Sequence, residues 1–276
     1  MAKRRKKDGP ETVLRELWPS ADPSRSVPLL KGLHVLTREG ALNADSRRKL
    51  KQVLHLVQLL RPPIAAILKE NDEPVLADLG AGKSYLGFVL YDLILGPAGR
   101  GRVVGVETRD DLVKASRELA QESGFERMSF VHSAIADASL ERGHCDIVIA
   151  LHACDTATDE AIGFALRHDA KLVALVPCCQ AEIARALEKE KGALSQLWRH
   201  PIQRREFGAH VTNVMRALYL ESKGYKVRVT ELTGWEHSLK NEFILAERHQ
   251  RSNATAKKEF DALVQQLGVR PSLLEA

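Results

Sequence analysis

A stretch that reads VLADLGAGKSYLG combines the glycines and charged side chains of a nucleotide-binding loop. A loop that cradles a triphosphate has the spacing G-x-x-x-x-G-K-[ST], because its glycines let the backbone wrap around the phosphates. Residues 82–84, GKS, match the end of that pattern, but Ala77 stands where its first glycine belongs. Asp78 would also lie among the phosphates, where its charge would repel them. The spacing therefore disfavours a triphosphate as the ligand of this loop.

The dinucleotide-binding spacing G-x-G-x-x-G fits little better, because Tyr85 takes the place of the third glycine. What remains is the order Asp78, Gly80, Gly82 between a hydrophobic strand and a helix. An acid beside two glycines suits a ligand that approaches the backbone closely and carries positive charge. S-adenosylmethionine has a sulfonium group, an ammonium group and no phosphate, so the loop favours this methyl donor as the cofactor.

Strands and helices alternate from residue 75 onward, which predicts an α/β fold. The predicted strands are 75–79, 102–107, 128–132, 146–151, 171–176, 225–232 and 242–247. The predicted helices between and after them include 84–95, 110–123, 156–168 and 205–222, with one more near the end of the chain. Five strand–helix units predict a parallel sheet with helices on both faces, and the last two strands predict an antiparallel hairpin at its edge.

The segment before the sheet is predicted to be partly helical. A short helix is expected near 11–17, followed by a loop with several prolines, and a helix is expected from 45. Pro62 and Pro63 are expected to break that helix, with a short second one behind them. The chain is thus divided into four parts. They are a basic tail at 1–10, a helical extension at 11–72, the main domain at 73–250 and a C-terminal helix and tail at 251–276.

Ligands of such a sheet bind at the carboxyl ends of the strands, where the strand order reverses. Glu107 ends the second predicted strand, and a carboxylate there can accept both ribose hydroxyls of an adenosine. After the third strand, Ile135 could flank the adenine. The predicted donor site comprises Asp78, Gly80, Ala81, Gly82, Lys83, Tyr85, Glu107, Thr108, Ser133, Ala134, Ile135 and Leu151.

Composition sets wide limits. With 276 residues, 44% of them apolar and 28% charged, the chain has the make-up of an ordinary globular protein. The sequence has no run of about 18 apolar residues, so it predicts no membrane helix. The basic start MAKRRKKDGP lacks the apolar core of a secretory signal. Four cysteines do not make a disulfide framework, so we expect a reducing, cytoplasmic location. The net charge of +5 permits RNA as a partner but does not demand it.

The region from about 75 to 250 resembles the class I S-adenosylmethionine-dependent methyltransferases in the loop at 78–82, in Glu107 and in the final hairpin. Within that superfamily, LHACDTATD from Leu151 and VPCC from Val176 resemble a subgroup with His-x-Cys-Gly-x-Ala-Thr-Asp and a Cys-Cys pair, which includes tRNA acceptor-stem 2′-O-methyltransferases. The chain departs from the subgroup at Asp155, where glycine is common, and it lacks the zinc-finger modules of the tRNA enzyme. The resemblance implies a Rossmann-like seven-stranded sheet and methyl transfer, with RNA (tRNA or rRNA) as the expected acceptor.

Four residues are candidates for catalysis: His152, Asp155, Cys178 and Cys179. His152 could act as the base for a hydroxyl acceptor, since an imidazole titrates near neutral pH, or it could be a structural histidine. A cysteine after the fourth or fifth strand could attack C6 of a pyrimidine, or the cysteines could simply pack near the donor. A metal site is disfavoured, because adjacent cysteines lack the C-x-x-C spacing.

RNA could be contacted by the basic N-terminal run and by Arg204, Arg205, Arg216, Trp235 and Lys240, where stacking and phosphate contacts would combine. The same residues could equally form a solvated helix face and a hairpin turn. Two other functions stay open at this point. One is methyl transfer to a small molecule or a protein, and the other is a donor- or RNA-binding protein without catalysis.

Overall fold

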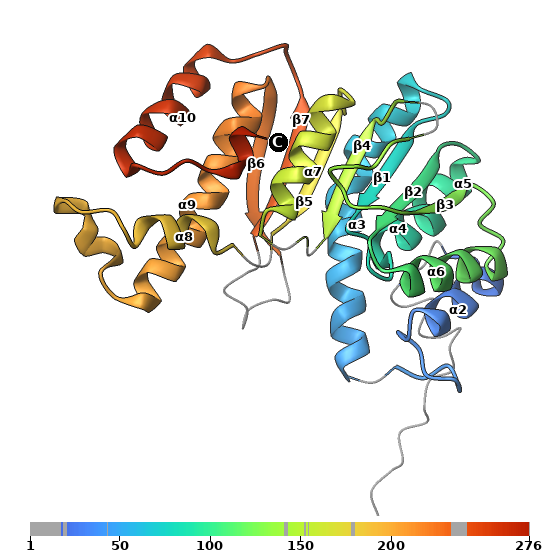
Figure 1. Ribbon diagram of the computed structural model, residues 1–276. Coiled ribbons are helices and arrows are strands. Elements are labelled where there is room, and N and C mark those ends of the chain that lie inside the picture. The colour runs from blue at the N-terminus through green and yellow to red at the C-terminus, as the bar shows by residue number, and fades with distance from the viewer. Residues whose placement is uncertain are drawn as a thin grey trace, which may run out of the picture.

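The protein is described from a computed structural model, which places residues 18, 21–42, 44–140, 143–151, 153, 155–177, 180–232 and 242–275. A seven-stranded sheet forms its centre, and helices cover both faces of that sheet (Figure 1). The strands are β1 (Val75–Leu79), β2 (Arg102–Glu107), β3 (Met128–His132), β4 (Ile147–Leu151), β5 (Leu172–Val176), β6 (Tyr225–Glu231) and β7 (Glu242–Arg248). Each lies within one residue of its predicted position, because most are short apolar runs between turn residues and β6 alternates apolar and polar residues.

The strand order is β3-β2-β1-β4-β5-β7-β6, and β7 runs antiparallel to both of its neighbours. This confirms the predicted Rossmann-like fold with an antiparallel pair at one edge. The order reverses between β1 and β4, so the carboxyl ends of these two strands open onto the crevice where such sheets bind ligands.

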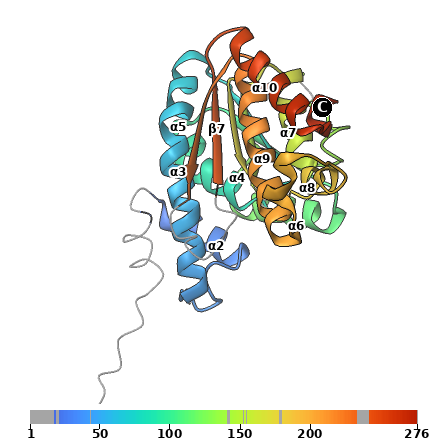
Figure 2. The ribbon, with the colours of Figure 1, turned by 90° about the vertical axis from the view of Figure 1, so that its left-hand side faces the viewer.

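Two layers of helices cover the sheet, and Figure 2 shows α3 on one side of it and α9 on the other. The helices are α2 (Pro23–Gly32), α3 (Ala44–Glu70), α4 (Tyr85–Leu90), α5 (Gly96–Ala98), α6 (Asp110–Glu122), α7 (Ala157–Arg167), α8 (Glu182–Leu187), α9 (Pro201–Ser222) and α10 (Ala254–Leu267). A π-helical turn, Tyr91–Leu95, joins α4 to α5, and short 3₁₀ segments span Ala193–Trp198 and Ser272–Leu274. One apolar core lies under α2, α3, α4 and α6, and the other lies under α7, α9 and α10.

The prediction that Pro62 and Pro63 break the helix was wrong, since α3 runs without interruption from Ala44 to Glu70. A proline inside a helix removes one hydrogen bond and crowds the preceding turn. Packing outweighs this cost here, because Leu60 and Ile64, on either side of the two prolines, are both 0% exposed. Tertiary burial therefore decides the helix where local propensity opposes it.

The prolines near the start of the chain were also misjudged as loop residues. Pro23 opens α2 at a position where a proline fits, because the first helical N–H has no intrahelical acceptor. Asp22 caps this helix by accepting a hydrogen bond from the backbone N–H of Ser24. The helix expected near 11–17 lies outside the described residues, and the division of the chain at 10, 72 and 250 stays a prediction. Among the described segments, no helix combines the length and the apolarity that a membrane span requires.

Replacing Pro62 by alanine should stabilise the protein. The change restores an N–H inside α3 and removes no buried side chain, because Pro62 is exposed. We expect the free energy of unfolding in urea to rise by about 1–3 kcal/mol. Pro23→Ala is the matched control, and it should stay within about 0.5 kcal/mol because no helical hydrogen bond is missing there. Equal changes in the two variants would contradict this account of α3.

Candidate functional site

The loop after β1 meets two other loops at Gly80. A Cβ atom placed on Gly80 would lie 3.9 Å from Cδ1 of Ile135 and 4.0 Å from Cβ of Ala153. The loops that follow β1, β3 and β4 are therefore in contact beside the point where the strand order reverses. Gly80 and Gly82 have φ of +64° and +57°, a left-handed conformation that is strained for a residue with a side chain. The glycines therefore allow this turn, and they let a ligand approach its backbone closely.

Asp78 stabilises that turn through hydrogen bonds made inside the protein. Its carboxyl group is 2% exposed, and Oδ2 accepts a hydrogen bond of 2.6 Å from the hydroxyl of Ser84. The backbone N–H of Gly87 donates to the same carboxyl group, and a Cβ on Gly87 would lie only 2.8 Å from Oδ2. Burial raises the pKa of Asp78 to about 7, against the opposing effect of these hydrogen bonds. The expectation of an acid facing the ligand is thus replaced by an acid that braces the loop from within the protein.

Glu107 is the carboxylate at the rim of the crevice. Oε2 accepts a 2.7 Å hydrogen bond from the N–H of Gly82, and Oε1 accepts from the backbone N–H and from Nε of Arg109 at 3.0 and 3.1 Å. Burial alone would raise the pKa of Glu107, but the hydrogen bonds from Arg109 and Gly82 hold it below its ordinary value. The carboxylate is therefore charged near neutral pH, and it can accept hydroxyl groups of a bound ligand.

The other predicted donor residues differ in their positions. Ser133 joins the site through its backbone N–H, which donates to the carbonyl of Glu107 at 3.1 Å. Tyr85 points elsewhere, since its hydroxyl donates to the carbonyl of Leu33 at 2.6 Å. Lys83 and Thr108 are exposed, while Ala81, Ala134 and Leu151 are half-buried. The structure thus brings Gly80, Gly82, Glu107 and the loop around Ile135 together.

Of the predicted catalytic residues, His152, Cys178 and Cys179 lie outside the described residues, as does Cys154. Asp155 is described, and its carboxylate is occupied. Oδ1 accepts from the backbone N–H of Ala181 at 3.0 Å, and Oδ2 lies 3.1 Å from the guanidinium of Arg185. Although burial acts to raise it, these partners lower the pKa of Asp155. A carboxylate held in this way is a weak base, so Asp155 positions the loop after β4 against α8.

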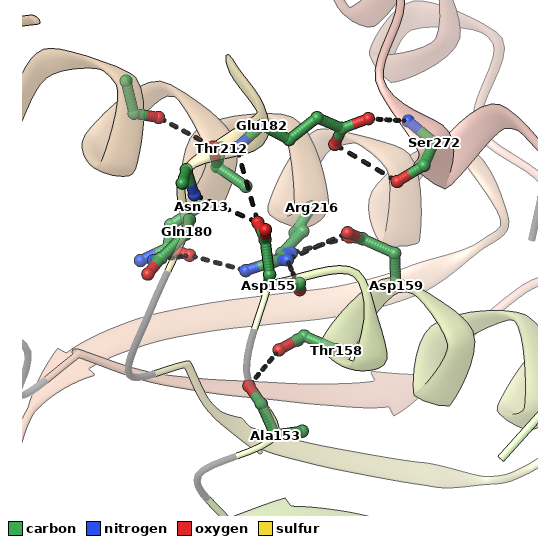
Figure 3. A network of polar contacts seen from close by, with 12 residues as sticks. Ala153, Asp155, Thr158, Asp159, Gln180, Glu182, Thr212, Asn213, Arg216 and Ser272 are labelled. Atoms are coloured by element: carbon green, nitrogen blue, oxygen red, sulfur yellow. Dashed lines mark hydrogen bonds and ion pairs between the residues drawn. The ribbon is translucent and has the colours of Figure 1, made fainter. Parts of the chain in front are cut away.

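Arg216 was expected on a surface that contacts RNA, and this prediction was wrong. The side chain is 1% exposed and forms a two-pronged ion pair with Asp159, at 2.7 and 3.0 Å (Figure 3). A third contact of 2.8 Å reaches the backbone carbonyl of Asp155. Helical spacing placed Arg216 on one face with exposed basic residues, but spacing does not show which face is covered. Here α7 covers it.

The same network continues into a cavity beside α9. The side-chain oxygen of Asn213 accepts hydrogen bonds from Arg216 at 3.3 Å and from Nε2 of Gln180 at 2.9 Å. Its nitrogen donates to Oε2 of Glu242, the first residue of β7. Gln180, Asn213 and Glu242 line a cavity of about 330 Å³ together with Pro177, Arg205, Glu206, Ala209 and His210. Gln180 follows the Cys-Cys pair in the sequence, whereas no sequence motif points to Glu242.

The remaining residues predicted to contact RNA divide into two groups. Arg205 is exposed on α9, whereas Arg204 is partly buried and pairs with Glu188 at 2.9 Å. The basic N-terminal run, Trp235 and Lys240 lie outside the described residues.

Comparison with known proteins gives the following matches. The model of a family described as "Methyltransferase domain" matches residues 48–186. A search of curated proteins found no match. Among solved structures, cofactor-bound Rv0187 from MTB has 20% identity and a TM-score of 0.48, over 90% of this chain and 100% of that one. An rRNA methylase from Streptococcus thermophilus has 12% identity and a TM-score of 0.43, over 65% and 89% of the two chains. Magnesium protoporphyrin IX methyltransferase from Synechocystis has 15% identity and a TM-score of 0.45, over 86% and 98%.

The raised pKa of Asp78 predicts a pH dependence of stability. Between about pH 4 and 7 the unfolded chain has lost this proton and the folded chain still holds it, so stability falls as the pH rises. Relative to Asp78→Asn, which does not titrate, the wild type should lose about 4 kcal/mol across this window in urea unfolding. Asp137→Asn, at an exposed position, is the control for the change in charge. A difference between wild type and Asp78→Asn that is constant with pH would contradict the assignment.

Removing the buried guanidinium should be costly. Arg216→Met leaves Asp159 charged and unpaired in the interior, and we expect the free energy of unfolding to fall by about 3–5 kcal/mol. Arg205→Met makes the same exchange at an exposed position of the same helix, and it should cost no more than about 0.5 kcal/mol. Similar losses in both variants would show that the network does not depend on Arg216.

Proposed function

We propose that this chain, which belongs to the methyltransferase-domain family that its residues 48–186 match, transfers a methyl group from S-adenosylmethionine to RNA. The family confirms the prediction of a methyltransferase and agrees with S-adenosylmethionine as the cofactor. The observation that carries the proposal is the meeting of three post-strand loops at Gly80, next to the charged carboxylate of Glu107.

The residues at this crevice suit the donor. The backbone at Gly80 and Gly82 lets a ligand approach closely, and Glu107 can accept the two ribose hydroxyls. Ile135, in contact with this turn, supplies an apolar wall for the adenine. S-adenosylmethionine, when bound, supplies a methyl group that its sulfonium has already activated. The protein then has to align the acceptor, and such positioning can contribute about 7–11 kcal/mol.

Charge on the neighbouring surface supports RNA as the acceptor. The side chains of Arg185 and Arg205 are 70% and 66% exposed, and both belong to the α8–α9 region beyond the carboxyl end of β5. Exposed cations of this kind bind phosphate backbones without requiring a particular sequence. Within the proposal, His152 is the candidate base for a hydroxyl acceptor, and Asp155 holds the loop that carries it.

Calorimetric titration tests the donor site. Wild-type protein should bind S-adenosylmethionine at micromolar concentration and should not bind ATP or NAD, because the loop lacks the phosphate-binding spacing. Glu107→Gln removes the charged acceptor and should weaken donor binding by about tenfold or more. Glu126→Gln, at an exposed position away from the loop, is the control. Binding of ATP alone, or unchanged donor affinity in Glu107→Gln, would reject this site.

Incubation with labelled donor and total RNA tests the acceptor. Label should appear in material that ribonuclease degrades, and RNA binding should weaken steeply between about 50 and 200 mM salt. Label that instead appears in added protein or in small molecules would assign the other methyltransferase class and reject RNA.

A further inference from the structure

We infer that the cavity between α9, β7 and the end of β5 recognises a guanine base that is turned out of its RNA strand. This inference rests on the proposed function and names the acceptor nucleoside of that same site. It is carried by two hydrogen-bond acceptors whose orientation the buried Arg216 fixes.

The orientation follows from the types of atom involved. A guanidinium only donates, so the atom of Asn213 that lies 3.3 Å from Arg216 has to be its oxygen. That oxygen also faces Gln180 at 2.9 Å, so Gln180 has to present its amide nitrogen there. The oxygen of Gln180 is then turned to the other side. It is buried, and it has no hydrogen-bond partner among the described residues.

Glu242 supplies the second acceptor. With the oxygen of Asn213 committed to Arg216, its nitrogen donates to Oε2 of Glu242. Oε1 of Glu242 is left 3.9 Å from Nδ1 of His210, which is beyond hydrogen-bond distance. The cavity thus contains two hydrogen-bond acceptors, the buried oxygen of Gln180 and Oε1 of Glu242. Both can accept a hydrogen bond from a ligand that has N–H or O–H groups.

Burying an amide oxygen without a partner costs free energy, which a ligand that donates to it would recover. Guanine is the RNA base with two neighbouring donors on one edge, N1–H and N2–H₂. Cytosine and adenine have one amino group beside an acceptor, and uracil has one N–H beside its carbonyls. A cavity of about 330 Å³ is at the small end of ligand sites, so it accommodates a single base and not a helix.

The guanidinium of Arg205 distinguishes a base from a protein side chain. Arg205 and His210 line the same cavity, 3.9 Å from Glu206 and from Glu242 respectively. An arginine or lysine side chain would bring a second positive charge to Arg205 and would have no acceptor to offer it. Guanine is neutral, and its O6 accepts hydrogen bonds beside the N1–H edge. A mixed set of donors and acceptors therefore fits guanine better than a cationic side chain.

The position of the cavity agrees with such a role. Pro177 follows β5 directly and Glu242 opens β7, so the cavity lies at the same end of the sheet as Gly80. The strand order β1-β4-β5-β7 places it three strands from β1, which is about 14 Å at the usual strand spacing.

Binding of short RNAs to the full-length protein tests the inference. The probes are labelled pentanucleotides UUGUU, UUIUU, UUAUU and UUUUU, measured by fluorescence anisotropy with saturating S-adenosylhomocysteine. Inosine keeps N1–H and O6 and lacks only the N2 amino group. We expect the guanine probe to bind about tenfold tighter than the inosine probe, and the other two to bind more weakly still.

Two variants connect this preference to the cavity. Gln180→Leu removes one acceptor, and Glu242→Gln turns an amide nitrogen into the cavity because Asn213 still donates to its oxygen. Each should abolish the preference for the guanine probe over the adenine probe, because adenine has neither N1–H nor a 2-amino group. The variant that removes the partner of the 2-amino group should also bring the guanine-over-inosine ratio to near one. Glu188→Gln, a surface residue paired with Arg204 outside the cavity, should keep the ratio of the wild type.

The outcomes separate this inference from the proposed function. A guanine preference that both variants abolish supports it. Equal binding of all four probes, or a preference that the variants leave intact, overturns the inference while donor binding and methyl transfer stand. Stronger competition by N-acetylarginine amide than by GMP overturns it in favour of a protein substrate. If a variant does not fold, the wild-type probe series decides alone. Absence of donor binding would overturn the proposed function as well.

Discussion

One buried guanidinium, that of Arg216, joins α7, α9 and the loop after β4 beside the cavity. A charge that is 1% exposed needs partners, because an unpaired buried charge costs several kcal/mol. Asp159 supplies the ion pair, and the carbonyl of Asp155 and the amide oxygen of Asn213 take the remaining contacts. The loop after β4 and α7, which follow each other in the sequence, are thereby held against the distant helix α9. The same arrangement orients the Gln180 oxygen, which has no partner among the described residues.

The donor side is organised by the backbone and by a neutral acid. Burial holds the pKa of Asp78 at about 7, which keeps this group largely protonated below neutral pH. Its bond to Ser84, itself at a φ of +51°, stabilises a turn that an alanine at Gly87 would crowd. Glu107 then links the turn to β2 through the N–H of Gly82. These contacts within the protein constrain the shape of the loop, which lowers the ordering cost of binding.

The sequence predicts the sheet and the donor loop well, because both depend on local patterns. Apolar runs bounded by turn residues locate most strands, and an alternation of apolar and polar residues locates β6. The spacing around Gly80 and Glu107 indicates where the crevice lies. Features that depend on contacts between residues far apart in the sequence cannot be predicted in this way. The burial of Leu60 and Ile64 carries α3 through two prolines, and Asp159, on another helix, draws Arg216 into the interior. Periodicity shows that a helix has faces, but it does not show what covers them.

The donor loop and the cavity differ in how they are built, and this affects how substitutions would act on each. The donor turn is one continuous segment whose glycines and acid constrain each other, so substitutions there act on methyl transfer as a whole. The acceptors of the cavity come from Gln180, which follows β5, and from Glu242, on β7, and both are oriented through Asn213 on α9. Exchange of a single amide or carboxylate there reverses a donor and an acceptor without disturbing Gly80 or Glu107. In the proposed guanine site, such exchanges would alter the base that is bound and leave the donor loop unchanged.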